Sequence, residues 1–124
     1  MNGGYLNSTE YITMAGTMPG PDMPMALSEH AMVAINSSVC MIIGGFNFDV
    51  YRSASTFYYD DIEGEWINGP SLIKGRYEHA AGIVTDEVTN ENFVAVTGGY
   101  YWPDSLDSTE ILQDGEWVQG KISI

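Results

Sequence analysis

Two pairs of short apolar runs stand out along the chain, and each pair predicts two β-strands. The first pair covers residues 31–35 and 39–43, and the second covers residues 80–85 and 93–97. Apolar runs of this length, bounded by turn-forming residues, are typical of strands rather than helices. Because polar residues hardly interrupt the runs, we expect neighbouring elements to cover these strands on both faces.

Each pair is followed by residues that complete a four-stranded antiparallel unit. The second strand of each pair leads into a diglycine, Gly44-Gly45 or Gly98-Gly99. Two residues without side chains can take positive φ values and approach a neighbouring backbone closely. After Gly44-Gly45, residues 46–53 predict a loop, residues 54–60 a third strand rich in β-formers, and residues 65–67 a short outer strand.

These units are copies of a sequence repeat. Gly20-Pro21 precedes Glu29-His30-Ala31 by the same distance as Gly69-Pro70 precedes Glu78-His79-Ala80. The diglycine also occurs at Gly3-Gly4, and a Ser-Thr pair follows each diglycine, in Ser8-Thr9-Glu10, Ser55-Thr56-Phe57 and Ser108-Thr109-Glu110. A period of about 40 to 55 residues with a strand pattern indicates propeller blades or a related array.

The repeated residues resemble the kelch repeat, in which a hydrophobic strand ends in Gly-Gly and is followed by a Glu or apolar residue, a Tyr-Asp and a spaced Trp. The second copy matches through Gly44-Gly45, Tyr59-Asp60 and Trp66, and the third through Gly98-Gly99, Glu110 and Trp117. Leu112-Gln113 stands where Tyr-Asp is expected in the third copy. The first copy is partial, because it begins at Gly3-Gly4 and has Thr17 in place of the Trp. The resemblance covers nearly the whole chain.

The resemblance implies an all-β fold, namely a kelch-type β-propeller segment of about two and a half four-stranded antiparallel blades. We expect a half blade at 1–18, a connector at 19–29, a blade at 30–67, a connector at 68–78, a blade at 79–118 and the start of the next connector at 119–124. Closed propellers have roughly 4 to 8 blades, so we expect a fragment whose partners include the remaining blades. Bare blade faces predict poor solubility or self-association when the fragment is made alone.

Composition and charge narrow the possible partners. The chain has 124 residues, of which 44% are hydrophobic, and 17 acidic residues against 4 basic ones give a net charge of −13. Nucleic-acid backbones attract the opposite sign, so we expect no nucleic-acid partner. The acidic residues fall mostly at expected turns, where they form either a solvated surface or an attractive field for a basic protein partner.

The sequence leaves the cellular location open. No apolar run reaches the length of a membrane span and no signal peptide is visible, so we expect a soluble chain with no membrane partner. Sequons at Asn7 and Asn36 would fit a secreted parent, and a cytoplasmic parent is the alternative.

Candidate catalytic and metal-ligating residues are few. His30 and His79 occupy equivalent repeat positions, which explains both without a metal, and Cys40 lies in an apolar run that is typical of a buried hydrophobic residue. No nucleophile, base and orienting group stand in a known pattern, so we expect no enzyme activity and no cofactor. Since some kelch-like propellers are copper-radical oxidases or sugar isomerases, the resemblance leaves an enzyme open for a longer parent.

The resemblance implies protein recognition by the loops that follow the diglycines, and a ubiquitin-ligase adaptor of the BTB-kelch type is the alternative. Candidate partner-binding residues, mostly aromatic, are Tyr5, Phe46, Phe48, Tyr51, Arg52, Tyr100, Tyr101, Trp102 and Asp104. Arg76 could add a cationic contact. The residues expected to serve the repeat structurally are Gly3, Gly4, Gly44, Gly45, Tyr59, Trp66, Gly98, Gly99, Glu110 and Trp117. Tyr59 and Trp66 suit the gap between adjacent blades.

Overall fold

The computed structural model describes residues 6–120, and this part of the chain is all-β, with no helix. The strands are β1 (Thr9–Thr13), β2 (Gly16–Gly20), β3 (Ala31–Ala34), β4 (Val39–Ile43), β5 (Phe46–Asn47), β6 (Tyr51–Arg52), β7 (Thr56–Asp60), β8 (Glu65–Asn68), β9 (Ala80–Thr85), β10 (Asn92–Thr97), β11 (Tyr100–Tyr101), β12 (Asp104–Ser105), β13 (Thr109–Gln113) and β14 (Glu116–Gly120). All the strand pairings are antiparallel. The all-β prediction is therefore confirmed.

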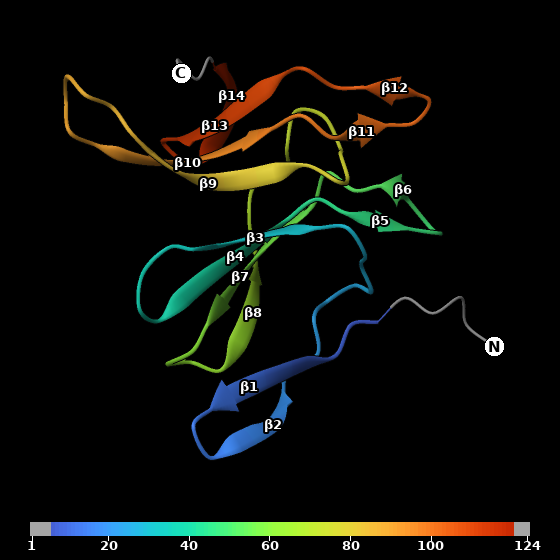
Figure 1. Cartoon of the computed structure of the whole chain (residues 1–124), viewed down its shortest axis with the longest axis vertical. Helices are drawn as coiled ribbons and strands as arrows, with labels where there is room; N and C mark the ends of the chain where they lie inside the picture. Colours follow the sequence, from blue (N-terminus) through green and yellow to red (C-terminus); the bar gives the residue numbers. More distant parts are fainter. Residues whose placement is uncertain (1–5, 121–124) are drawn as a thin grey trace.

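Two four-stranded sheets form the body of the molecule. The first sheet has the order β3-β4-β7-β8, and the second has the equivalent order β9-β10-β13-β14. Figure 1 shows the two sheets stacked one above the other, with the β1–β2 hairpin beneath the first sheet. Most predicted strands shift by one or two residues at their ends, whereas β4 and β9 have the predicted limits.

Two segments expected to be loops contain strands. The connector expected at 19–29 begins within a strand, because Gly16–Gly20 pairs with β1, with Pro19 opposite Glu10. Proline is tolerated there because β2 is an outer strand, where its missing N–H costs no ladder hydrogen bond. Residues 46–53 likewise contain the small hairpin β5–β6, and β11–β12 is its counterpart after the second diglycine.

The expectation that the first strand of each unit is covered on both faces is wrong. Met32 in β3 keeps 64% of its surface exposed, and Ile83 in β9 is also exposed. Both strands lie at the ends of their sheets, whereas β4 and β10, with neighbours on either side, carry the buried residues. An apolar sequence alone does not distinguish a terminal strand from a central one.

The main core joins the two sheets. Its buried residues are Val33, Met41, Ile43, Leu72, Val94, Val96 and Trp117, and they come from both sheets and from the connector between them. Burial of this apolar surface drives the sheets together. Trp117 is only 5% exposed, and its indole Nε1 donates a hydrogen bond to the Pro70 carbonyl oxygen at 3.0 Å.

A second core lies on the opposite face of the first sheet. Met23 and Leu27 from the connector between β2 and β3 pack against Ile42 and Phe57. Met25 and Trp66 pack at its margin, so flexible methionine side chains fill space under this connector.

The same local hydrogen bonds recur in successive copies of the repeat. The Trp66 indole Nε1 donates to the Pro21 carbonyl oxygen at 3.0 Å, as Trp117 does to Pro70. The Thr9 hydroxyl also donates to the Pro21 carbonyl oxygen, and the Thr56 hydroxyl to that of Pro70, both at 2.7 Å. Each Gly-Pro connector is thus fastened to the sheets by equivalent side chains.

Tyr59 links the first sheet to the β1–β2 hairpin. Its ring lies 5.1 Å from that of Trp66, measured between centroids, and its hydroxyl is hydrogen-bonded to the Tyr11 hydroxyl of β1. This hydrogen bond is the main reason that the pKa of Tyr59 is raised to about 12. Tyr59 therefore has a packing role, as expected for the gap between successive units.

The diglycines need glycine for steric reasons. Gly44 and Gly99 have φ values of 65° and 88°, in the region that side chains disfavour. A Cβ on Gly99 would lie 2.6 Å from the Tyr77 carbonyl oxygen, and one on Gly44 would lie 2.7 Å from the Arg76 carbonyl oxygen. Close approach to the connector therefore excludes larger residues, as predicted. Gly3 and Gly4 lie outside the described residues.

Candidate interaction surface

Two small hairpins, β5–β6 and β11–β12, extend from the same end of the two sheets (Figure 1). Each hairpin follows a diglycine, and each is tied to a connector by an isolated β-bridge, Ser28 with Phe46 and Tyr77 with Tyr100. Tyr51 and Trp102 therefore lie at the same end of the molecule, as the repeat predicted.

An aromatic cluster spans both hairpins. We define it as Phe46, Phe48, Tyr51, Tyr77 and Tyr100. Phe46 lies at its centre, with centroid distances of 5.2 Å to Tyr77, 6.0 Å to Phe48 and 6.1 Å to Tyr51. The Tyr77 and Tyr100 rings are 6.0 Å apart, so Tyr77 connects the two hairpins.

Tyr77 was missed by sequence reasoning. It precedes Glu78-His79-Ala80 at a position where the earlier copy has Ser28, so the repeat contained no aromatic signal there. Its role follows from the β-bridge that brings the connector beside β11.

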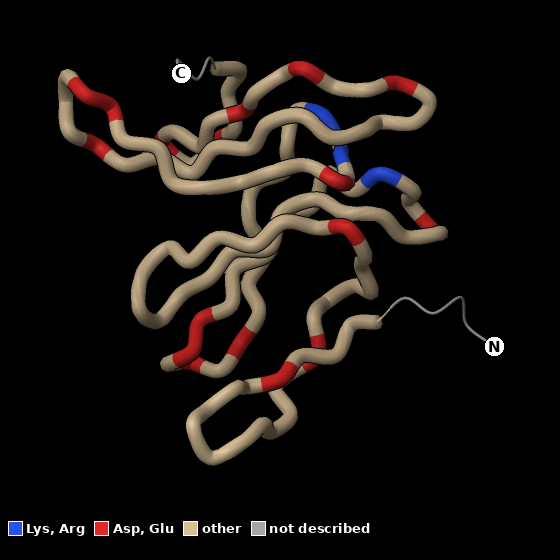
Figure 2. Tube along the Cα trace, viewed as in Figure 1, with Lys and Arg blue, Asp and Glu red and all other residues tan. Residues whose placement is uncertain are grey.

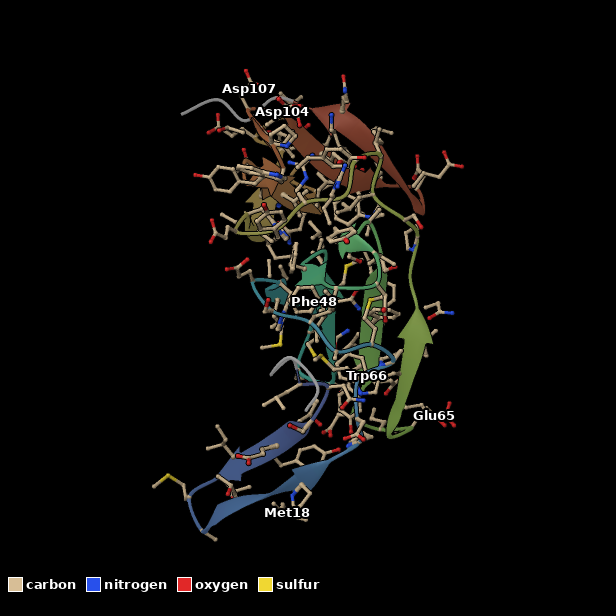
Figure 3. All side chains as sticks on the ribbon, turned by 90° about the vertical axis from the view of Figure 1, so that its right-hand side faces the viewer. Met18, Phe48, Glu65, Trp66, Asp104 and Asp107 are labelled. Carbon is tan, nitrogen blue, oxygen red and sulfur yellow. The ribbon has the colours of Figure 1, made fainter. Side chains whose placement is uncertain are left out.

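Much of this end is accessible to a partner. Trp102 and Phe48 keep 66% and 61% of their surfaces exposed, and Tyr51 and Tyr100 are exposed as well. Figure 3 is turned so that this end faces the viewer, with Phe48 on the middle hairpin and Asp104 and Asp107 above it. Tyr101 is half-buried, and Tyr5 lies outside the described residues.

Two cationic side chains lie over one aromatic ring at this end. The Arg52 guanidinium carbon is 3.9 Å from the Tyr101 ring centroid, and the Lys74 Nζ is 4.7 Å from it. Both distances are within the range of cation–π attraction. Arg52 and Tyr101 come from different hairpins and were both candidates from the sequence, whereas Lys74 comes from the connector and was not.

The expectation that Arg76 adds an accessible cationic contact is wrong. Its side chain is fully buried and forms an ion pair with Glu110, with 2.8 Å between the guanidinium nitrogen and the carboxylate oxygen. The guanidinium also donates to the carbonyl oxygens of Gly98 and Ser108 at 3.1 and 3.0 Å. Arg76 thus satisfies buried acceptors around the diglycine and is unavailable to a partner.

Glu110, the acidic partner in this ion pair, also holds the connector between β8 and β9 in place. Its carboxylate accepts hydrogen bonds from the backbone N–H groups of Ile73 and Lys74 at 2.6 and 3.2 Å. Gly75 follows, and a Cβ there would lie 2.5 Å from the Arg52 carbonyl oxygen. The connector therefore crosses directly against β6, which brings Lys74 beside Arg52.

The earlier copy of the repeat has an apolar pair where the later copy has this ion pair. Leu27 stands at the position of Arg76 and Phe57 at that of Glu110, and both pack in the second core. The two substitutions occur together, because a buried charge without its partner would be costly. This paired difference between copies is a signal by which the sequence could have revealed the contact.

Two equivalent glutamates lie side by side shortly before β3 and β9. Glu29 and Glu78 have φ values of 55° and 54°, and the Glu78 N–H donates to the Glu29 carbonyl oxygen at 3.0 Å. Partial burial, the nearby Glu78 carboxylate and a hydrogen bond to it raise the pKa of Glu29.

His79 has a buried ring held by one hydrogen bond. Its Nε2 lies 2.9 Å from the Ile43 carbonyl oxygen, so this nitrogen carries the proton of the neutral ring. Its Nδ1 is buried without a hydrogen-bond partner. Burial lowers the pKa of His79 to about 4, and the charges of Arg76 and His30 add to this effect.

We expect the stability of the chain to fall as the pH is lowered from about 7 to about 4. The unfolded chain then gains a proton on His79, with an ordinary pKa of 6.5, that the folded chain does not bind until about pH 4. The stability that neutral His79 contributes to the folded chain is complete above the pKa of His79 in the unfolded chain. It is lost as the pH falls from that value to about 4. The expected loss is about 2 to 3 kcal/mol.

Urea unfolding of wild type and His79→Gln at several pH values would measure this loss, because carboxylate titrations shared by both proteins cancel in the difference. Imidazole resonances observed by NMR should show His79 still neutral at pH values where an ordinary histidine is charged. A His79 resonance that titrates at its ordinary pKa would contradict the assignment.

Few of the described residues are candidates for metal binding or for nucleophilic catalysis. Within residues 6–120, no group of three or more His, Cys, Asp or Glu side chains is placed to hold a metal ion. Cys40 is half-buried, and burial raises the pKa of its thiol. The part of the chain that the structure describes also contains no helix long and apolar enough to cross a bilayer.

Comparison of the sequence with models of protein families gave no match, and comparison with curated proteins gave none either.

Proposed function

We propose that this chain is a non-catalytic protein–protein interaction module built from kelch-type repeats. It binds a partner protein through the surface formed by β5–β6 and β11–β12. The observation that carries the proposal is the aromatic cluster, which runs across both hairpins and leaves Phe48, Tyr51 and Tyr100 exposed at one end, with Trp102 nearby.

The residue types and their support favour recognition. Large aromatic side chains and arginine carry much of the binding energy in protein interfaces, because they bury a large area at a low entropic cost. The two hairpins are fastened to the connectors by β-bridges and by the contacts of the diglycines, so the surface is preorganised.

The recurring Trp-to-proline and Thr-to-proline hydrogen bonds support a kelch-type array. Because each copy fastens its connector in the same way, further copies could extend the stack on either side. We propose that the remaining blades of a larger propeller complete it.

Trp102→Ala should weaken partner binding by about 2 kcal/mol, roughly a thirtyfold rise in Kd, and should leave the fold intact. The indole is exposed, so its loss removes contact area from the interface without opening the core. Immobilised wild-type and variant chains, compared for the partner that they retain from an extract and then by titration with that partner, would measure the effect.

Ile62→Ala is the control, since Ile62 is also a largely exposed apolar residue but lies in the turn after β7, away from the hairpins. It should leave binding unchanged. Equal retention of the partner by Trp102→Ala and the control would refute the proposed surface.

A further inference from the structure

The two cations over Tyr101 have no carboxylate partner of their own. Among the described residues, the Arg76–Glu110 bridge is the one ion pair, and it involves neither Arg52 nor Lys74. Asp104 lies opposite Tyr101 in the β11–β12 register, yet it forms no ion pair with either cation. Arg52 and Lys74 therefore keep donors available to an incoming group.

Both cations are held in position before any partner arrives. The Lys74 backbone is fixed by its hydrogen bond to Glu110, and Gly75 carries the connector closely past β6. Arg52 is paired with Phe46 in the β5–β6 hairpin. The buried Arg76–Glu110 bridge thus keeps the exposed cation of the connector, Lys74, beside the half-buried cation of the hairpin, Arg52.

Two like charges at one ring favour an anion. The ring attracts each cation through its quadrupole but carries no net charge, so repulsion between the cations is not compensated. A carboxylate has two oxygens and could accept charge-assisted hydrogen bonds from both side chains at once.

Nine of the 17 acidic residues of the chain lie away from these two cations. Figure 2 shows the lysine and arginine segments together at the hairpin end, with several acidic segments beside them and other acidic segments in the turns at the opposite end. Asp49, Asp104 and Asp107 belong to the two hairpins or follow them directly. The turns far from the hairpins contain Asp60, Asp61, Glu63, Glu65, Asp86, Glu87, Glu91, Asp114 and Glu116. These turns therefore contain more than half of the acidic residues, whereas Arg52 and Lys74 form a local cationic pair at Tyr101.

We propose that the hairpin surface recognises an acidic segment of its partner, with an Asp or Glu carboxylate held by Arg52 and Lys74 beside Tyr101. An apolar side chain next to that carboxylate packs on the aromatic cluster. This inference rests on the proposed function and selects its partner, because it favours an acidic segment over the basic partner that the net charge suggests.

A library of random short peptides displayed on phage, selected on the immobilised chain, tests the inference without knowledge of the partner. Recovered peptides should be enriched in Asp and Glu next to apolar residues. Arg52→Gln and Lys74→Gln should each weaken these peptides roughly tenfold. Added salt should weaken them as well.

Gln113→Glu is the matched control, because it changes the net charge by the same amount at the end of β13, away from the hairpins. It should leave peptide affinity unchanged, and urea unfolding should show that all three variants remain folded.

Trp102→Ala separates the inference about an acidic segment from the proposed function of the hairpin surface. If Trp102→Ala weakens the recovered peptides but they lack acidic enrichment and ignore both cation substitutions, the inference is overturned and the proposed function stands. If no recovered peptide depends on Trp102, the proposed function fails, and the inference fails with it.

Discussion

Arg76→Leu is expected to lower the free energy of unfolding by about 3 to 5 kcal/mol. The substitution leaves the Glu110 carboxylate buried without its cation, and it removes the donors that serve the carbonyl oxygens of Gly98 and Ser108. Urea unfolding followed by far-ultraviolet circular dichroism would measure the change. A loss below about 1 kcal/mol would show that solvent reaches Glu110 and solvates its charge.

The chain itself supplies the matched control for this prediction. The double variant Arg76→Leu with Glu110→Phe reproduces the Leu27 and Phe57 pair of the earlier copy. It removes the unpaired charge, so it should be clearly more stable than Arg76→Leu alone. It should not recover fully, because the Ile73 and Lys74 N–H groups lose their acceptor. A double variant no more stable than the single one would mean that the loss comes from packing rather than from the buried charge.

Trp117→Ala is expected to cost about 3 to 5 kcal/mol of unfolding free energy. The indole is almost completely buried in the core that joins the two sheets, and its Nε1 donates to the Pro70 carbonyl oxygen. Removing it leaves a cavity between the sheets and takes from the Pro70 carbonyl oxygen one of its two donors, the other being the Thr56 hydroxyl. Unfolding in urea, followed by the fluorescence of the remaining tryptophans, would give the value.

Trp66→Ala is the comparison within the same repeat. Trp66 occupies the equivalent position of the repeat, but its side chain is half-buried and lies at the margin of the second core. The structure therefore predicts a smaller loss for Trp66→Ala than for Trp117→Ala. The reverse order would mean that the β1–β2 hairpin contributes more stability than the contact between the two sheets.

The candidate surface was predictable only in part. The diglycine repeat placed the Phe46 and Tyr100 hairpins at one end, because equivalent positions in a repeat occupy equivalent places in space. Tyr77 and Lys74 were not predictable in this way, since both belong to a connector whose path depends on the close approach of Gly75 to Arg52 and of Tyr77 to Gly99. The contact of Arg52 with Tyr101 joins two hairpins that are far apart in the sequence.

The sequence by itself determined the all-β class, the approximate strands and the places where only glycine fits, because these depend on local residue type and on the spacing between copies. The tertiary structure decided which apolar strands are covered, since Met32 and Met41 lie in equally apolar runs but only Met41 has neighbouring strands on both sides. The tertiary structure also decided which charged side chains are buried. Arg76 is buried because Glu110 and two carbonyl groups surround it, whereas Arg52 remains partly exposed over Tyr101. Local sequence does not record such differences, because they depend on contacts between residues brought together only by folding.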